Sequence, residues 1–108
     1  MPETFLRAAN IREIQPGEKK LVNIGDTRIL LVNLEGTFYA LEGKCTHASV
    51  TLSRGQIQGE NIVCPLHKSE FNIKSGAAVT PPAIRNLTVY DVRIQGEEIL
   101  IRNSVEEP

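Results

Sequence analysis

The chain has two cysteines and two histidines, and these four residues fall in two tight pairs. The pairs read Cys45-Thr46-His47 and Cys64-Pro65-Leu66-His67, and sixteen residues separate His47 from Cys64. Two thiolates and two imidazoles form a complete ligand set for either of two centres. One is a single tetrahedral zinc ion, and the other is a binuclear iron–sulfur centre in which two histidines replace two cysteines on one iron. The pattern C-x-H-x16-C-x2-H therefore predicts a metal centre.

The spacing within each pair bears on which of these two centres is present. Structural zinc sites usually take pairs of ligands separated by two to four residues, so that both members reach one ion. Only Thr46 separates Cys45 from His47, which fits that geometry poorly. In a binuclear centre each loop can give its cysteine to one iron and its histidine to the other. The spacing favours the binuclear centre and leaves zinc as the alternative.

Outside these pairs the chain consists of short apolar segments separated by turn residues. In four places two such segments flank a glycine beside an acidic residue, which suits the tight turn of a hairpin. The predicted hairpins join 21–24 to 28–34, 29–34 to 37–41, 56–58 to 61–63, and 89–95 to 98–102. No segment of eleven or more residues keeps a helical apolar period. The expected fold is all-β, an antiparallel sandwich or barrel.

Three local patterns make this expectation more specific. The segment 29–34 is apolar on both faces, so we expect it to be covered on both sides. Along 89–95 the alternation directs Tyr90, Val92 and Ile94 toward the core. Near the beginning of the chain, Asn10 is expected to cap a single helical turn.

Two longer stretches, about 42–55 and 64–82, are expected to be irregular. Each contains one cysteine–histidine pair. Loops that bury no apolar face need another source of order, and a shared metal centre would provide it. We therefore expect the two loops to form a small metal-binding subdomain on the β-fold.

Length and charge exclude several other classes of protein. A chain of 108 residues leaves little room for a second domain, so residues 1–108 are expected to form one. Its net charge of −1 lacks the basic excess of a nucleic-acid-binding domain. The longest aliphatic run, 29–32, is too short to span a bilayer, and no secretory signal is visible. We expect a monomeric cytoplasmic protein with reduced cysteines and with no membrane or nucleic-acid partner.

The ligand pattern, together with its flanking residues, resembles the Rieske family. The similarity extends from about Thr27 to Ile101. It rests on Cys45-Thr46-His47, Leu52-Ser53-Arg54-Gly55, Cys64-Pro65-Leu66-His67, Phe71, Gly76 and Pro81-Pro82.

The resemblance implies one Rieske-type [2Fe–2S] cluster, with Cys45 and Cys64 on the inner iron and His47 and His67 on the outer iron. Two Fe³⁺, two sulfides, two thiolates and two neutral imidazoles sum to zero charge, whereas four thiolates would give a negative centre. Adding an electron to a neutral centre costs less, so the reduction potential is higher than that of all-cysteine clusters.

Within the family the chain looks like a Rieske-type ferredoxin. Such carriers pass single electrons from an NADH-linked flavoprotein reductase to a Rieske non-haem-iron oxygenase. The chain has no room for a catalytic iron domain, so we expect an electron-transfer protein without catalytic residues. Two alternatives remain: a small Rieske subunit of a nitrite reductase-like complex, and a zinc-stabilised interaction module.

The resemblance also bears on the reduction potential. Respiratory members of the family join the two loops by a disulfide, but Val50 and Leu66 occupy the matching positions here. Those members also use a serine and a tyrosine to hydrogen-bond sulfur. Ser69 matches the serine, whereas Phe71 replaces the tyrosine and has no donor. Fewer hydrogen bonds to sulfur predict a potential in the lower half of the Rieske range.

Two glycines and two prolines complete the motif. Gly55 and Gly76 are expected at positions that require a positive φ. Pro81-Pro82 is expected to form a proline loop that screens the cluster, as the resemblance implies.

Charged residues of both signs flank the two ligand pairs. Lys44 and Lys68 are accompanied by Glu42 and Glu70. We therefore expect a mixed, solvated rim without a dominant charge.

Overall fold

The computed structural model describes residues 5–25, 27–43, 51–65, 68–79 and 86–102. Within these ranges the chain forms strands and two short 3₁₀ helices, and it has no α-helix there. The elements are β1 (Phe5–Asn10), η1 (Ile11–Glu13), β2 (Lys19–Ile24), β3 (Thr27–Leu34), β4 (Thr37–Glu42), η2 (Leu52–Arg54), β5 (Gln56–Gln58), β6 (Asn61–Val63), β7 (Glu70–Asn72), β8 (Val89–Tyr90), β9 (Val92–Gln95) and β10 (Glu98–Arg102).

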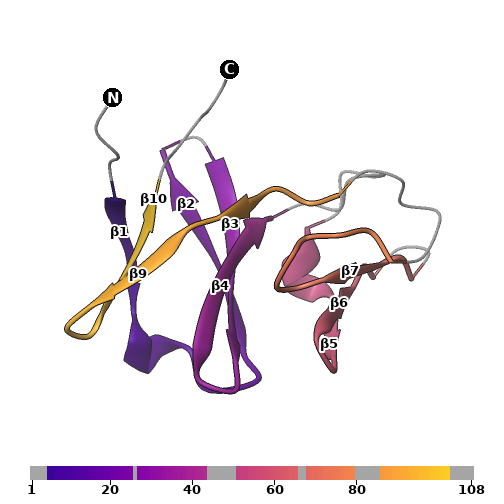
Figure 1. Cartoon of the computed structure of the whole chain (residues 1–108), viewed down its shortest axis with the longest axis horizontal. Helices are drawn as coiled ribbons and strands as arrows, with labels where there is room; N and C mark the ends of the chain where they lie inside the picture. Colours follow the sequence, from indigo (N-terminus) through magenta and orange to yellow (C-terminus); the bar gives the residue numbers. More distant parts are fainter. Residues whose placement is uncertain (1–4, 26, 44–50, 66–67, 80–85, 103–108) are drawn as a thin grey trace.

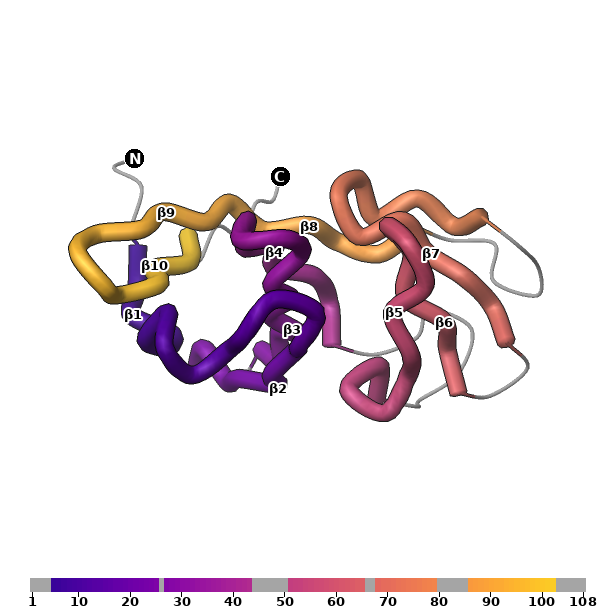
Figure 2. The backbone as a smooth tube through the Cα atoms, turned by 90° about the horizontal axis from the view of Figure 1, so that it is seen from below, coloured from indigo at the N-terminus to yellow at the C-terminus, as the bar shows by residue number. Residues whose placement is uncertain are grey.

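The strands form three sheets, with the orders β1-β10-β9, β2-β3-β4-β8 and β5-β6-β7. Every strand pair is antiparallel, which confirms the all-β expectation. Figure 1 shows the first two sheets together as a base, with the smaller β5-β6-β7 unit beside it. Figure 2 shows the same two parts from below, and the segment leading into β8 runs from the smaller unit back to the base.

All four predicted hairpins are present, each closed by a two-residue turn. Their closing pairs are Ile24↔Thr27, Leu34↔Thr37, Gln58↔Asn61 and Gln95↔Glu98. The sequence signal was accurate here because a two-residue turn fixes the strand register directly.

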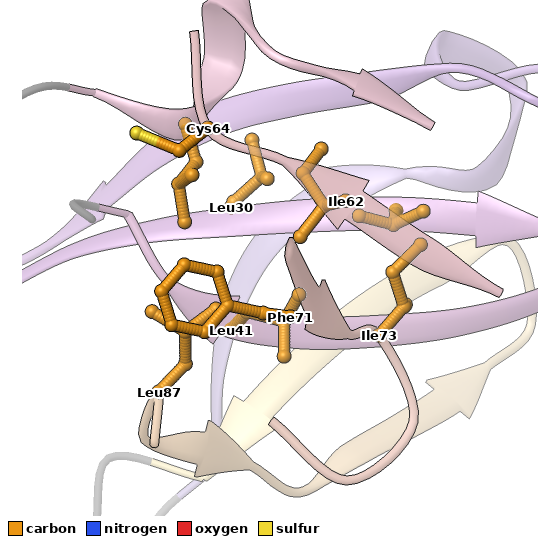
Figure 3. Packing of buried hydrophobic residues seen from close by; sticks show 9 residues of the cluster. Leu30, Leu41, Ile62, Cys64, Phe71, Ile73 and Leu87 are labelled. Carbon is orange, nitrogen blue, oxygen red and sulfur yellow. The ribbon is translucent and has the colours of Figure 1, made fainter. Parts of the chain in front are cut away.

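Strand β3 is covered on both faces, as predicted. Leu30 and Val32 belong to a buried cluster that joins the base to the β5-β6-β7 unit. Ile29 and Leu31 belong to a second cluster, which packs the other face against β1 and β10. Figure 3 shows the first cluster, in which Ile62, Cys64, Phe71 and Ile73 from the smaller unit meet leucines of the base. This shared core holds the smaller unit against the base.

The last hairpin differs from the prediction in two respects. The segment 89–95 is not one strand: it is interrupted at Asp91, so that β8 pairs with β4 and β9 pairs with β10. Tyr90 and Val92 pack against the second cluster as expected, but Ile94 is 46% exposed. The predicted alternation of apolar and polar residues is correct for Tyr90 and Val92. Strand β9 lies at the edge of its sheet, and its end at Ile94 extends past the second cluster.

The irregular stretches are also more ordered than predicted. The stretch 42–55 contains η2, and the stretch 64–82 contains β7, which pairs with β6. Strand β1, which the hairpin signals missed, pairs with β10 at the other end of the sequence. A three-residue strand and a long-range pairing both depend on tertiary contacts, and neither leaves a local turn signal.

The predicted helical turn at the beginning of the chain is confirmed. The Asn10 side chain accepts a hydrogen bond from the Arg12 N–H at 2.8 Å, and Glu13 completes a capping box. Within the described ranges, no helix has the length and apolar character needed to cross a bilayer.

Candidate metal centre

Of the four predicted ligands, the structure describes Cys64. Cys45, His47 and His67 lie outside the described residues, as do Lys44 and Pro81-Pro82. Among the side chains that are described, no three from histidine, cysteine, aspartate and glutamate form a metal-binding group. The described residues therefore show the position of Cys64 and the hydrogen bonds that hold the ends of the ligand loops.

Cys64 follows β6 directly and is fully buried. Figure 3 shows it at one end of the first cluster, with its sulfur directed away from Ile62 and Ile73. Its backbone N–H donates to the Ser69 carbonyl at 2.7 Å. The thiol is thus presented at the margin of an apolar core, and the two ends of the short loop that follows it are bonded together.

The ends of the first ligand loop are bonded in a similar way. The Leu52 N–H donates to the Gly43 carbonyl at 2.9 Å, and the Gly43 N–H donates to the Arg28 carbonyl at 3.0 Å. The described residues on either side of the segment 44–50, which contains Cys45 and His47, are therefore bonded to each other, and Gly43 is also bonded to β3.

Gly55 brings the bases of the two ligand loops into contact. A Cβ atom added at Gly55 would lie 2.1 Å from the Val63 carbonyl oxygen, and Val63 immediately precedes Cys64. The predicted reason for this glycine was wrong, because its φ is −77°, which any residue can adopt. Close backbone approach requires the glycine here, and it sets the distance between the two loop bases.

Gly76 meets the prediction and has a second role. Its φ is +78°, and an added Cβ would also lie 2.4 Å from the Leu87 carbonyl oxygen. The Leu87 N–H donates to the Gly76 carbonyl at 2.7 Å. The Ala78 N–H donates to the Asn86 side-chain oxygen at 2.9 Å. These bonds tie together the two ends of the segment that contains Pro81-Pro82.

Glu42 connects this third segment to the first ligand loop. Its N–H donates to the Thr88 carbonyl at 2.8 Å, and its Oε1 accepts from the Thr88 N–H at 2.9 Å. Burial, with a smaller contribution from the Glu42 carboxylate, raises the pKa of Tyr90 above its ordinary value, so its phenol stays protonated at neutral pH. Sequence reasoning assigned Glu42 only to a solvated rim. No local motif marks a contact between residues so far apart in the chain.

The two residues considered as sulfur neighbours are both buried. Phe71 and Ser69 have no measurable exposure, and Phe71 belongs to the first cluster. The role of Ser69 toward sulfur stays a prediction.

The chain matches a known family over most of its length. Residues 4–91 match the Rieske [2Fe–2S] domain. The biphenyl dioxygenase ferredoxin subunit of Pseudomonas sp. strain KKS102 is 33% identical over 99 residues, which cover 91% of each chain. The ferredoxin component of the naphthalene 1,2-dioxygenase system of Pseudomonas aeruginosa is 33% identical over 101 residues, covering 94% of this chain and 97% of that one.

Solved structures agree with this match. The ferredoxin of carbazole 1,9a-dioxygenase from Nocardioides aromaticivorans IC177 superposes with a TM-score of 0.86 at 30% identity, covering 91% of this chain and 96% of that one. A chain from a complex of reduced oxygenase and oxidised ferredoxin in carbazole 1,9a-dioxygenase gives 0.88 at 28% identity, covering 96% and 97%. A putative nitrite reductase small subunit from Mycobacterium tuberculosis gives 0.85 at 19% identity, covering 98% and 100%, a level of identity that shows the fold alone.

The chain belongs to the Rieske [2Fe–2S] domain family. Within this family it is an electron-transfer protein of the ferredoxin type, and its cofactor is a Rieske-type [2Fe–2S] cluster. The donor set fits that group, since two thiolates and two imidazoles are what a Rieske centre requires. The placement of Cys64 fits it too, because the buried backbone presents its sulfur at the edge of the core.

Proposed function

We propose that Cys45, His47, Cys64 and His67 hold the cluster, with the cysteines on the inner iron and the histidines on the outer iron. The chain contains no other cysteine or histidine. The adjoining loop bases at Gly55 and Val63 support this assignment, because they let the two ligand pairs converge from neighbouring points.

We also propose that the chain carries single electrons from an NADH-linked flavoprotein reductase to a Rieske non-haem-iron oxygenase. One observation supports this above all. The relatives named as ferredoxin components of dioxygenase systems match this chain over nine-tenths or more of both lengths. The match therefore extends over almost the whole of these ferredoxin components.

The fold suits this task because a carrier needs a site that changes little as its charge changes. When bound, the cluster supplies a site for one electron. Around it, the bonds from Cys64 to Ser69 and from Leu52 to Gly43 fix the loop ends, and Phe71 keeps water from the core side of Cys64. Rigid surroundings that exclude water on one side limit the structural change that accompanies a change in the charge of the site. Contacts with either partner are expected to be small and transient.

Assembly and location belong to the same proposal. We propose a monomer that consists of one Rieske domain over residues 1–108 and works in the cytoplasm. The described ends of the chain support a single unit, because Phe5 in β1 pairs with Arg102 in β10.

The test combines the purified holoprotein with the reductase and the oxygenase of its own host. The expected result is NADH-dependent turnover of the oxygenase that needs all three components. The Cys64→Ser variant is the matched control without a complete ligand set, and turnover should fall to the level of the mixture that lacks the carrier. An oxygenase that receives electrons from the reductase equally well without the chain would contradict the proposal.

A further inference from the structure

A small pocket of about 180 Å³ opens beside Cys64. It lies where the corner between η2 and β5 faces the beginning of the second ligand loop, and Gln56, Cys64 and Pro65 contribute to its wall. Two cationic side chains, Arg54 and Lys68, also line it, and both residues are exposed. The pocket thus adjoins Cys64, a predicted cluster ligand.

The two cations of this pocket, Arg54 and Lys68, form no ion pair with a carboxylate among the described residues. Other described cations are engaged. Arg7, Arg12, Lys20, Lys74 and Arg102 form ion pairs, and the Arg93 guanidinium lies 4.1 Å from the centre of the Phe5 ring. Lys19 and Arg28, on β2 and β3, are the remaining described cations without an ion pair, and they do not line the pocket. The positive charge beside Cys64 is therefore not neutralised by a described carboxylate.

The glutamates that flank the ligand pairs, Glu42 and Glu70, form hydrogen bonds with residues outside this pocket. The Glu42 carboxylate accepts from the Thr88 N–H. The Glu70 carboxylate accepts from the Asn61 side-chain amide at 3.0 Å, at the opposite end of β6 from Cys64. Neither Glu42 nor Glu70 is among the described residues that line this pocket.

The backbone of Lys68 adds a second indication. Its φ is +63°, in the left-handed region that a residue with a Cβ adopts at a cost of roughly 1 kcal/mol or more. Glycine or asparagine would relieve this strain. A strained lysine whose side chain is exposed at a functional site is consistent with a role for its charge.

A polar groove elsewhere on the molecule provides a contrast. It lies between the β3–β4 and β5–β6 turns and is lined by Glu35, Tyr39, Glu60 and Lys74 among others. Its cation is neutralised, because the Lys74 ammonium lies 3.1 Å from the Glu60 carboxylate, which raises the pKa of Lys74. Of these two hollows, the one beside Cys64 is thus the one whose described cations form no ion pair with a described carboxylate.

We propose that Arg54 and Lys68 form a cationic docking patch that receives surface carboxylates of the terminal oxygenase next to Cys64. This inference rests on the proposed electron-carrier function. It adds the sign of the charge that the carrier presents to the oxygenase, and the residues that carry this charge. The oxygenase is the chosen partner because a fold neighbour comes from a complex of an oxygenase and a ferredoxin. Uncompensated charges at an interface rim act mainly on association rate and orientation.

The first experiment measures the local charge without any protein partner. The double variant Arg54→Gln, Lys68→Gln is compared with Arg12→Gln, Lys20→Gln, which removes the same charge from η1 and β2. Each reduced holoprotein is mixed in a stopped-flow instrument with the anionic cobalt(III)–EDTA complex or with cationic hexaamminecobalt(III). One electron passes from the cluster to Co(III), which becomes Co(II), and no bond to the protein forms or breaks.

Coulomb's law predicts the size of the effect. Two charges about 10 Å from an approaching monoanion should change its rate about threefold at low ionic strength, and the difference should vanish in high salt. The patch variant should react more slowly with the anionic complex and faster with the cationic one. The control variant should change neither rate by more than about 1.5-fold. Equal changes in both variants would overturn the proposed patch.

The second experiment measures electron transfer to the oxygenase of the host at low ionic strength. The patch variant should lower the second-order rate constant about threefold or more and weaken its dependence on salt. The charge-preserving variant Arg54→Lys, Lys68→Arg should retain the wild-type rate constant and salt dependence. An unchanged rate, or a loss confined to the reaction with the reductase, would overturn the docking assignment. Failure of the wild-type protein itself to reduce the oxygenase would overturn the proposed function, and the cobalt rates would still report the local charge.

Discussion

Replacing Gly55 by alanine perturbs the contact between the two ligand-loop bases without changing charge or polarity. Alanine tolerates the local φ of −77°, so the backbone conformation itself is not strained. The added Cβ, however, would lie 2.1 Å from the Val63 carbonyl oxygen and 3.1 Å from its carbon, whereas ordinary contact begins at about 3.4 Å. Both obstacles are backbone atoms, so a side-chain rotation cannot relieve the clash.

The two segments would have to part by more than about 1 Å, which would disturb the pairing of Gln56 with Val63. Overpacking of this kind costs typically 1–3 kcal/mol, and we expect the upper end, about 3 kcal/mol, because backbone must move. For a domain of this size that corresponds to a fall in Tm of roughly 12–20 °C. Since Val63 precedes Cys64, we also expect less iron and sulfide per chain.

The matched control is Gly59→Ala. An added Cβ there meets nothing within 4 Å, but the φ of +61° is unfavourable for alanine. We expect a loss of about 1–2 kcal/mol and no loss of cluster. Thermal unfolding of the holoproteins, with iron and sulfide analysis, measures both effects. A Gly55→Ala protein as stable and as fully loaded as the wild type would refute the account of the loop bases.

Three further predictions concern the loop connections and the potential. Glu42→Ala should lower the free energy of unfolding by about 1 kcal/mol through loss of the Thr88 bond, as measured by urea titration, and Glu42→Gln, which keeps an acceptor oxygen, should lose less than half of that. An alanine variant as stable as the wild type would contradict this role. Asn86→Ala should speed amide hydrogen exchange at Ala78 about fivefold, while Asn86→Asp should preserve protection, and equal exchange in both variants would show that the side-chain bond is unimportant. The reduction potential should lie in the lower half of the range of roughly −150 to +300 mV, because the buried Phe71 offers no donor to sulfur, and a strongly positive value in a potentiometric titration would exclude that reasoning.

Sequence reasoning succeeded where a local signal determines the structure. The two-residue turns closed the predicted hairpins, and the doubly apolar pattern of β3 correctly indicated cover on both faces. Asn10 capped its helical turn because capping depends on residues only three positions apart. The cysteine–histidine pattern and its flanking residues resembled the Rieske family, and the comparison with known proteins confirmed that family.

It failed where distant segments determine the structure. Position 55 requires glycine because the Val63 carbonyl approaches it closely across the β5–β6 pair. The residues around Gly55 in the sequence do not indicate this contact. The bond from Thr88 to Glu42 spans 46 residues, so Glu42 looked like an ordinary surface charge. Arg54 and Lys68 line one pocket only because of the fold, so the sequence did not indicate a shared role for them.

The central claim is that these two cysteines and two histidines bind one mixed-ligand diiron cluster. The most direct measurement is pulsed EPR of the reduced holoprotein, together with metal analysis, on the wild type and on His47→Ala, His67→Ala. The account predicts about two iron and two sulfide per chain, with nitrogen couplings from two imidazoles that disappear in the variant. A wild-type protein that binds zinc and no iron, or a variant that keeps the unaltered spectrum, would contradict it.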